Sequence, residues 1–239
     1  MAGQSRESGA KVLVWDFPTR VFHWSLVILV LTSFFTGMGW SGLPSENWVH
    51  QWSGIFIMVL LFFRIVWGFV GGRHARFTDF IKGPSAVLRY AKGLVTGAHE
   101  QWRGHNPVGG LSVIAMLGLL TAQVGTGLFA NDDSDFEAPL FELVGKDLSD
   151  TLTSFHYDII IAIYVVIAVH VSAIIFYRFK GEHLVAAMLH GHKEVPDESA
   201  ARDAETDGPA DGPKAAGNLY LALGILAVSI GLAVWIINL

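Results

Sequence analysis

The sequence contains no cysteine, and only 15% of its 239 residues are charged. The absence of cysteine excludes disulfide bonds, iron–sulfur clusters, zinc sites with thiolate ligands and the covalent attachment of a c-type haem. A soluble domain has about 25% charged residues, so the low charge and the 52% of hydrophobic residues argue against that class. The composition therefore predicts an integral membrane protein, and no nucleic-acid partner is expected.

Long apolar runs take the place of charge. A helix needs roughly 20 residues to cross the hydrocarbon core of a bilayer, and five runs have this length: 21–40, 51–71, 108–129, 154–177 and 219–237. The runs are continuously apolar and do not alternate, which excludes a transmembrane β-barrel. The first run has no small-x-small cleavage pattern after it, so we expect a retained helix and not a signal peptide.

Lysine and arginine are nearly absent from alternate loops. The loops on one side of the predicted membrane carry Lys146 alone, whereas the loops on the other side carry most of the 16 basic residues. Basic residues accumulate on the cytoplasmic side of membrane proteins. We therefore expect a multi-pass membrane protein with its N-terminus in the cytoplasm and, after five spans, its C-terminus outside.

The same patterns divide the chain into four parts. We expect a cytoplasmic segment (1–19), a four-helix membrane bundle (20–193), a flexible linker rich in Asp, Glu, Ala, Pro and Gly (194–216), and a C-terminal membrane helix (217–239). The last run has no ionisable residue, which is typical of an accessory anchor. Between the second and third runs, Pro84 could open a short helix in the membrane interface, and 181–190 could form another. A basic topological loop is the alternative for the first of these.

Four histidines lie within or at the ends of the apolar runs: His23, His50, His156 and His170. By depth they form two pairs, an outer pair (His50 and His156) and an inner pair (His23 and His170). His156 and His170 are 14 residues apart, which separates them by roughly 21 Å along one helix and by only about 40° around it. Imidazole nitrogen is a standard axial ligand of haem iron, so each pair can fill both axial positions of one haem.

An interhelical hydrogen bond is the alternative role for any single membrane histidine. Two pairs at matched depths favour haem. Arg64 follows His50 by 14 residues, and a haem propionate is a natural partner for an arginine so deep in an apolar run. Alternatively, Arg64 snorkels to the inner surface. Arg20, one turn before His23, is a second candidate for a propionate contact.

Glycines recur near the histidines on the first three apolar runs. Because glycine lacks a side chain, it could leave room for a porphyrin, although small residues also serve helix packing in membranes. The residues concerned are Gly37, Gly39, Gly54, Gly109, Gly110, Gly125 and Gly127.

Several motifs, in a fixed order, closely resemble the bacterial cytochrome b561 and nickel–iron hydrogenase b-type cytochrome family. They are Val-Trp-Asp-Phe-Pro-Thr-Arg-Val-Phe-His-Trp (14–24), Arg-Ile-Val-Trp-Gly-Phe-Val-Gly-Gly-Arg-His-Ala-Arg-Phe (64–77), Gly-His-Asn-Pro-Val-Gly-Gly (104–110) and Glu-His-Leu-Val-Ala-Ala-Met-Leu-His-Gly-His-Lys (182–193). The resemblance covers roughly residues 12–193. It implies a four-helix bundle that holds two haems b, and the residues that match the family's ligands are His23, His50, His156 and His170. The fifth run and its linker depart from the family pattern.

The resemblance also implies a function. We expect an electron conduit, more than an enzyme in its own right, between the quinone pool and a periplasmic redox partner. The motifs are most similar to those of members paired with a periplasmic dihaem cytochrome c, and hydrogenase-linked members come next. Four residues near the inner pair are candidate quinone contacts, although polar residues at helix ends are commonly just solvated: Arg73, His74, His105 and Asn106.

The outer segment 131–150 is acidic. It has seven acidic residues against Lys146 alone, and such a surface could steer a basic face of a soluble cytochrome c, or simply reflect the scarcity of basic residues in outer loops. Two other functions stay open. A quinone reductase acting on superoxide or another small molecule would need a basic funnel at the outer haem, and a proton-coupled transporter would use the histidines as a relay without haem.

Overall fold

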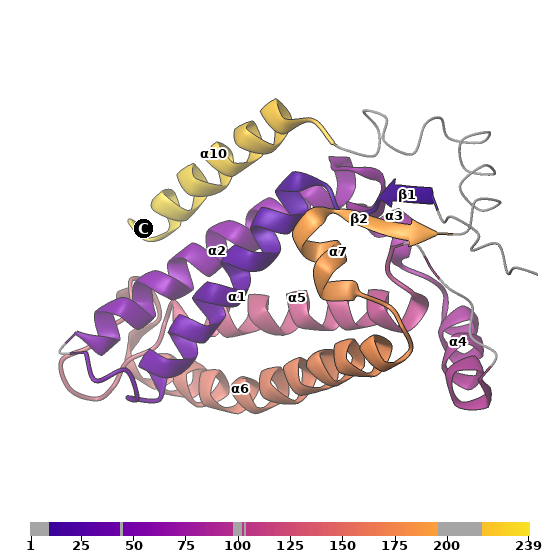
Figure 1. Ribbon diagram of the computed structural model, residues 1–239. Coiled ribbons are helices and arrows are strands. Elements are labelled where there is room, and N and C mark those ends of the chain that lie inside the picture. The colour runs from indigo at the N-terminus through magenta and orange to yellow at the C-terminus, as the bar shows by residue number, and fades with distance from the viewer. Residues whose placement is uncertain (1–9, 44, 98–101, 103, 196–216) are drawn as a thin grey trace, which may run out of the picture. The chain divides into compact units, whose positions relative to one another are not determined.

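The computed structural model describes residues 10–43, 45–97, 102, 104–195 and 217–239. Among these residues, five helices are long and apolar enough to cross a membrane. They are α1 (Phe17–Gly37), α2 (Glu46–Val70), α5 (Pro107–Gly127), α6 (Phe141–Phe179) and α10 (Leu219–Ile236). The prediction of an all-α membrane protein with five spans is confirmed (Figure 1).

Short elements connect the long helices: β1 (Ala10–Leu13), η1 (Arg73–Ala75), α3 (Phe77–Phe80), α4 (Pro84–Thr96), α7 (Leu184–His190) and β2 (His192–Val195). The two short helices expected near Pro84 and in 181–190 are present as α4 and α7. Proline suits the first turn of α4 because its missing N–H has no partner there in any case. Strand β2 extends two residues into the predicted linker, and the rest of that linker (196–216) lies outside the described residues.

The chain forms two compact units. The first comprises residues 1–20, 67–111 and 173–219, and the second comprises residues 21–66, 112–172 and 220–239. Helices α1, α2, α5 and α6 each contribute residues to both units. The first unit holds the short elements, and the second holds most of the apolar helix length.

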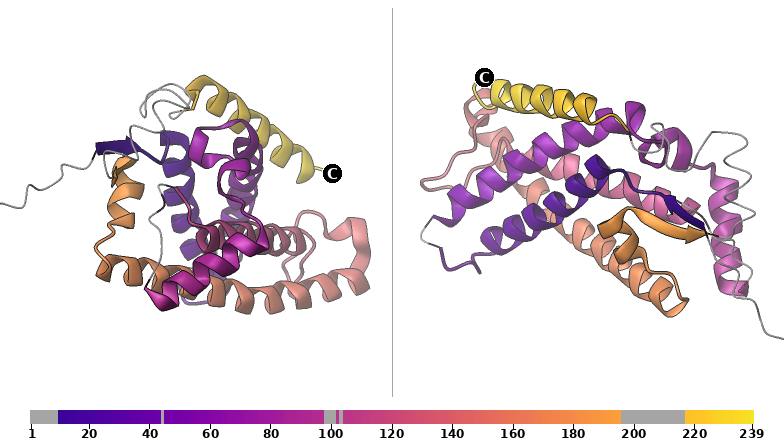
Figure 2. Two further views of the ribbon diagram at one scale, coloured as in Figure 1. Left: turned by 90° about the vertical axis from the view of Figure 1, so that its right-hand side faces the viewer. Right: turned by 45° about the horizontal axis from the view of Figure 1, so that its top comes forward.

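In the first unit, two distant segments pair as a small sheet. Strand β1 is antiparallel to β2, with Lys11 opposite Glu194 and Val12 opposite Lys193. The two strands lie side by side in Figure 2. The Gly191 carbonyl then accepts hydrogen bonds from the N–H groups of Val14 (2.8 Å) and Trp15 (3.0 Å). Position 191 requires glycine, because its φ is 88° and a Cβ there would lie 2.8 Å from the Trp15 carbonyl oxygen.

The Asp16 carboxylate joins the start of α1 to the end of α2 within the first unit. One oxygen accepts the Thr19 N–H (2.8 Å) and so caps α1, while the other accepts the indole N–H of Trp67 (3.1 Å) and the Gly72 N–H (3.1 Å). Asp16 is 3% exposed and Trp67 is fully buried. A buried carboxylate needs such donors to offset its lost hydration. Gly217, before α10, also packs on the Trp67 ring, where a Cβ would lie 2.7 Å from Cζ2.

In the second unit, α2 is the most buried of the candidate spans. One of its faces carries Ile57 and Leu61, which pack with Leu120 and Ile163 in the core of the bundle. The other face carries a cluster in which Ile55, Met58 and Val59 pack with Ala233 of α10. Figure 1 shows α10 running beside α2.

Helix α10 presents one face of small and medium-sized residues to its neighbours: Ala222, Ile225, Ser229 and Ala233 are all buried. Their spacing of three or four residues marks a single helical face. The last span therefore packs against α2 through this face, as Ala233 does in the cluster with Ile55, Met58 and Val59.

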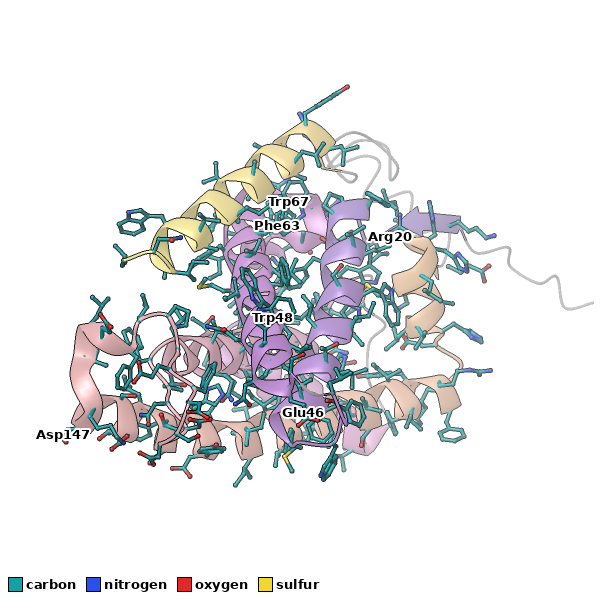
Figure 3. The ribbon with its side chains drawn as sticks, turned by 90° about the vertical axis from the view of Figure 1, so that its left-hand side faces the viewer. Arg20, Glu46, Trp48, Phe63, Trp67 and Asp147 are labelled. Carbon is teal, nitrogen blue, oxygen red and sulfur yellow. The ribbon has the colours of Figure 1, made fainter. Side chains whose placement is uncertain are left out.

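Helix α6 begins earlier than the predicted span. The apolar run starts at 154, but the helix starts at Phe141 and passes a kink at Gly145, where φ is 71° and ψ is 172°. Acidic and other polar residues lie along this extension, and Asp147 points outward from it (Figure 3). Apolar periodicity could not place this start, because a solvent-exposed extension of a helix needs no apolar stripe.

Replacing Asp16 by alanine should strongly destabilise the fold. The indole N–H of Trp67 and the N–H of Gly72 would lose their acceptor while they stay buried, and the N-cap of α1 would be lost. We expect a loss on the order of 3 kcal/mol in the free energy of unfolding, measured by helical circular dichroism in detergent during thermal or denaturant unfolding. The exposed Asp147→Ala is the matched control. Equal stability of the two variants would contradict this role of Asp16.

Candidate functional site

The second unit contains all four predicted histidines. His23 lies on α1, His50 on α2, and His156 and His170 on α6. Each imidazole is half-buried among the apolar helices. Three helices therefore supply the histidines, as the sequence predicts, and α5 supplies neighbours but no histidine.

The structure brings the outer pair together. The ring centroids of His50 and His156 are 6.1 Å apart, and the two ring planes are nearly perpendicular at 86°. A metal–imidazole bond is about 2 Å long and a ring nitrogen lies roughly 1 Å from its ring centre, so one iron bound by two imidazoles separates the centroids by about 6 Å. The separation of the outer pair thus fits a single haem iron between the rings.

Backbone carbonyls fix which nitrogen of each outer histidine is available. His50 Nδ1 lies 2.9 Å from the Ser33 carbonyl oxygen, and His156 Nδ1 lies 2.9 Å from that of Gln123. Because a carbonyl only accepts, Nδ1 must carry the hydrogen in both rings. The lone pair then resides on Nε2, and a ligating histidine ordinarily donates its other N–H in this manner. The Gln123 amide lies 3.0 Å from His156 Nε2, which fits a lone pair on that atom.

The two carbonyls belong to matching turns near the ends of α1 and α5. Ser33 is followed by Thr36 and Gly37, and Gln123 is followed at the same spacing by Thr126 and Gly127. The threonine hydroxyls lie 3.5 Å from His50 Nδ1 and 3.3 Å from His156 Nδ1. Each histidine ring therefore contacts the same arrangement on the neighbouring helix: a backbone carbonyl, then a threonine hydroxyl three residues later and a glycine four residues later.

Gly37 and Gly127 make this close approach possible. A Cβ at Gly37 would lie 2.8 Å from Cε1 of His50, and a Cβ at Gly127 would lie 2.9 Å from Cε1 of His156. By contrast, nothing lies within 4 Å of a Cβ placed at Gly54 or Gly125, so these positions border open space as a flat ligand would require. Gly110 packs on Phe80, where a Cβ would be 2.5 Å from its carbonyl oxygen, and so serves helix packing.

The inner pair is less completely built. His23 lies on α1 and His170 on α6. The Nδ1 atom of His23 is buried and has no hydrogen-bond partner among the described residues, and its ring stacks edge-on against Trp24 at 5.1 Å. A buried ring nitrogen without a protein partner is a group that a metal or another ligand can satisfy.

The two arginines differ in their surroundings. Arg64 is 3% exposed, so its side chain does not snorkel to the surface, and that alternative is wrong. A buried guanidinium requires acidic or carbonyl partners. Arg20 belongs to the first unit, where its Nη1 donates to the Leu189 carbonyl at 2.7 Å. Its observed role is therefore to hold the end of α7.

The predicted quinone contacts all lie in the first unit. His74 Nδ1 lies 2.9 Å from Oδ2 of Asp79. Burial opposes ionisation of Asp79, but the hydrogen bond and charge of His74, followed by Arg73, outweigh it and lower the pKa of the Asp79 carboxyl. His105 packs between Trp15 and Phe80, with centroid distances of 4.6 and 4.8 Å.

Asn106 has two structural partners. Its Oδ1 accepts the Gly109 N–H (2.8 Å) at the start of α5, and its Nδ2 donates to the Tyr177 hydroxyl (3.0 Å). The amide is therefore committed within the protein. Tyr177 was not among the predicted residues.

Sequence reasoning also missed Ser33, Gln123, Thr36 and Thr126. The signal was present as a Thr-Gly pair at the end of two apolar runs, each preceded by a polar residue three positions earlier. This pattern can be interpreted only when the histidine that packs against it is known. That histidine lies on another helix, so the contact between the helices must be known first.

Enlarging Gly127 to alanine should disturb one centre selectively. The new methyl group would displace the His156 ring, at a cost of about 1–3 kcal/mol for an overpacked core. We expect an optical redox titration of the purified protein to show one haem with a shifted midpoint potential or reduced occupancy, and the other unchanged. Gly118→Ala is the control, because nothing lies within 4 Å of a Cβ there. The proposed contact is refuted if both variants titrate like the unmodified protein.

The chain is similar in sequence to known proteins. The sequence model of the prokaryotic cytochrome b561 family matches residues 14–191. The chain is 26% identical over 225 residues to a probable Ni/Fe-hydrogenase B-type cytochrome subunit of Rhodobacter capsulatus, which covers 78% of this chain and 83% of the relative.

Shorter matches carry the same description. A probable Ni/Fe-hydrogenase B-type cytochrome subunit of Rhizobium leguminosarum bv. viciae is 31% identical over 88 residues, or 31% of this chain and 37% of the relative. One of Azotobacter vinelandii is 26% identical over 125 residues, or 43% of this chain and 51% of the relative. No solved structure matches the chain.

The family match spans the first four long helices and both histidine pairs. Together with five candidate membrane spans, it identifies a multi-pass membrane protein of the b-type cytochrome class, whose role is electron transfer. The chain belongs to the prokaryotic cytochrome b561 family.

Proposed function

We propose that the protein binds two haems b and carries electrons across the bacterial inner membrane, between the quinone pool and a periplasmic redox partner. His50 and His156 are the axial ligands of the outer haem, and His23 and His170 are those of the inner haem. The observation that carries this proposal is the outer pair, whose 6.1 Å separation and carbonyl-bound Nδ1 atoms leave two Nε2 lone pairs for one iron.

Two such haems would form a continuous path. His156 and His170 are both on α6, and 14 residues of helix separate them by roughly 21 Å along the axis. An iron with two imidazole ligands has no vacant position, so it passes electrons and does not bind oxygen. The two haems would therefore act as successive one-electron carriers between two faces of the membrane.

A quinone is the proposed redox partner at the inner haem. Conversion between quinol and quinone moves two electrons and two protons, so the two one-electron haems can handle the electrons one after the other. The protons must enter or leave through polar groups at that face. In the first unit, the lowered pKa of the Asp79 carboxyl keeps it ionised, so Asp79 serves as the hydrogen-bond partner of His74 and not as a carrier of quinol protons.

The periplasmic partner is proposed to be a cytochrome c, such as a dihaem cytochrome c, or a hydrogenase. The relatives are named as probable subunits of a Ni/Fe-hydrogenase, so a hydrogenase is the partner that those names indicate for the relatives. Here the segment 131–150 supports a partner with a basic face. Most of its carboxylates are exposed, and its one lysine, Lys146, is already paired with Asp133 and Asp150.

Family membership argues against a transporter that lacks haem. A quinone reductase fed by superoxide or another small anion is the second candidate. It would require a positively charged outer surface to attract its substrate. The acidic character of the segment 131–150 disfavours it.

Histidine variants can separate the two ends of the path. A short-chain quinol, mixed anaerobically with the purified protein in a stopped-flow spectrophotometer, should exchange electrons with both haems. His50→Ala should remove the outer haem and leave rapid exchange with the inner one. His170→Ala should remove the inner haem and slow the exchange with the remaining haem by at least tenfold.

Dithionite supplies the control, because it should reduce the remaining haem fully in every variant. In His170→Ala, slow exchange with quinol together with full reduction by dithionite means that the outer haem is present but no longer receives electrons rapidly from quinol. Undiminished quinol exchange in His170→Ala would contradict the assignment of the quinone to the inner haem. A separate experiment, accessibility of N- and C-terminal labels in intact cells, locates both termini relative to the membrane; the N-terminus is expected in the cytoplasm.

A further inference from the structure

A short chain of hydrogen bonds in the first unit includes one of the predicted quinone contacts, Asn106. The hydroxyls of Tyr90 on α4 and Tyr177 on α6 are 2.8 Å apart, and Asn106 Nδ2 donates to the Tyr177 oxygen at 3.0 Å. Both tyrosines are only 8% exposed. Residues 87 positions apart are therefore joined through two phenols.

The hydrogens of this chain exceed its acceptors. The bond between the phenols uses the hydrogen of one hydroxyl, whichever tyrosine donates, and the Asn106 amide supplies its own. One phenolic hydrogen is left over. Among the described residues, Asn106 Oδ1 accepts the Gly109 N–H and forms no hydrogen bond with either hydroxyl. The Tyr90–Tyr177 pair can therefore donate one further hydrogen bond to a group that the described residues do not provide.

A second surplus donor lies beside the first. The Trp102 ring stands edge-on to the Tyr90 ring, with centroids 6.4 Å apart and planes at 88°. Its Nε1 is buried and has no partner among the described residues. A buried N–H or O–H without an acceptor costs about 1–3 kcal/mol, so two neighbouring ones call for a ligand that accepts hydrogen bonds.

The surrounding charges favour a neutral acceptor. Lys193 forms an ion pair with Glu182 (2.7 Å) and donates to the Trp102 carbonyl (2.8 Å), so its charge is neutralised locally. Lys82 lies 5.9 Å from the Trp102 ring centroid, over its face. Burial first, then the Tyr177 hydrogen bond and the charge of Glu182, raise the pKa of the Tyr90 hydroxyl, which stays a protonated donor at physiological pH. The nearby Glu182 carboxylate disfavours an anionic ligand.

We propose that Trp102 and the Tyr90–Tyr177 pair donate hydrogen bonds to the carbonyl oxygen of a quinone head group. This assignment rests on the proposed function and names the residues that would bind its substrate. Tyr177 follows His170 by seven residues on α6, which is two turns and about 10 Å along the axis. A head group at Tyr177 would therefore lie near the inner haem. Asn106 acts through Tyr177 and is a positioning residue.

Removing the donors should weaken quinone binding without altering the haems. Two conservative variants test this, Trp102→Phe and the double variant Tyr90→Phe with Tyr177→Phe, because either single tyrosine variant keeps one free hydroxyl. The probe is a short-chain ubiquinone analogue titrated into the purified haem-loaded protein in nanodiscs of uncharged phosphatidylcholine. We expect its Kd, and the KM for haem oxidation by it, to rise about tenfold in each variant.

Matched controls are Trp48→Phe and Tyr157→Phe, whose side chains are exposed on α2 and α6. These variants should bind the quinone like the unmodified protein, and all variants should keep the same haem content and midpoint potentials. An unchanged Kd in both test variants would overturn the inference, because water would then be the acceptor. An equal rise of the Kd in the control variants would also overturn it. So would displacement of the quinone analogue by added phosphatidylglycerol when the test variants leave the Kd unchanged.

A different result would refute the proposed function itself. If the unmodified protein neither binds the quinone nor exchanges electrons with it, the quinone itself is wrong. If the unmodified protein does both and the variants do the same, only the assignment to Tyr90, Tyr177 and Trp102 is wrong.

Discussion

The hydrogen bond from an imidazole Nδ1 to a backbone carbonyl of the neighbouring helix is the interaction on which the outer site depends. It fixes the tautomer and leaves Nε2 as the only ligand atom, and it fixes the rotation of the ring between two helices. Gly37 and Gly127 permit that bond, because a side chain there would occupy the space of the ring. Helix α2, which carries His50, packs through two faces, one of them against α10.

The motifs that carry the family resemblance have a second role. Apart from residues 21–24 and 64–66, they lie in the first unit. There Asp16 binds Trp67 and Gly72, the Gly191 carbonyl binds Val14 and Trp15, and His105 packs on Trp15. Segments far apart in the sequence thus build one framework from which four long helices leave. The family motifs therefore supply contacts that hold the ends of the long helices, as well as candidate haem ligands.

Much of this could be predicted from the sequence. Apolar runs of sufficient length predict five spans, and Pro84 predicts the start of α4, because both signals are local. The pairing of β1 with β2 and the partners of His74, His105 and Asn106 depend on contacts between distant segments. The burial of Arg64 and the packing of α10 on α2 likewise follow from tertiary structure. Depth and helix rise were enough to pair His50 with His156, but not to identify Ser33 and Gln123.

The haem content per polypeptide tests the central claim most directly. The pyridine haemochrome assay, combined with amino-acid analysis of the purified protein, gives this ratio without assumptions about partner or substrate. Two paired-histidine sites predict two haems b per chain, released by acidic solvent because no cysteine is present to hold them covalently. A ratio of one or of zero would contradict the account, since at least one of the two histidine pairs would then not hold a haem.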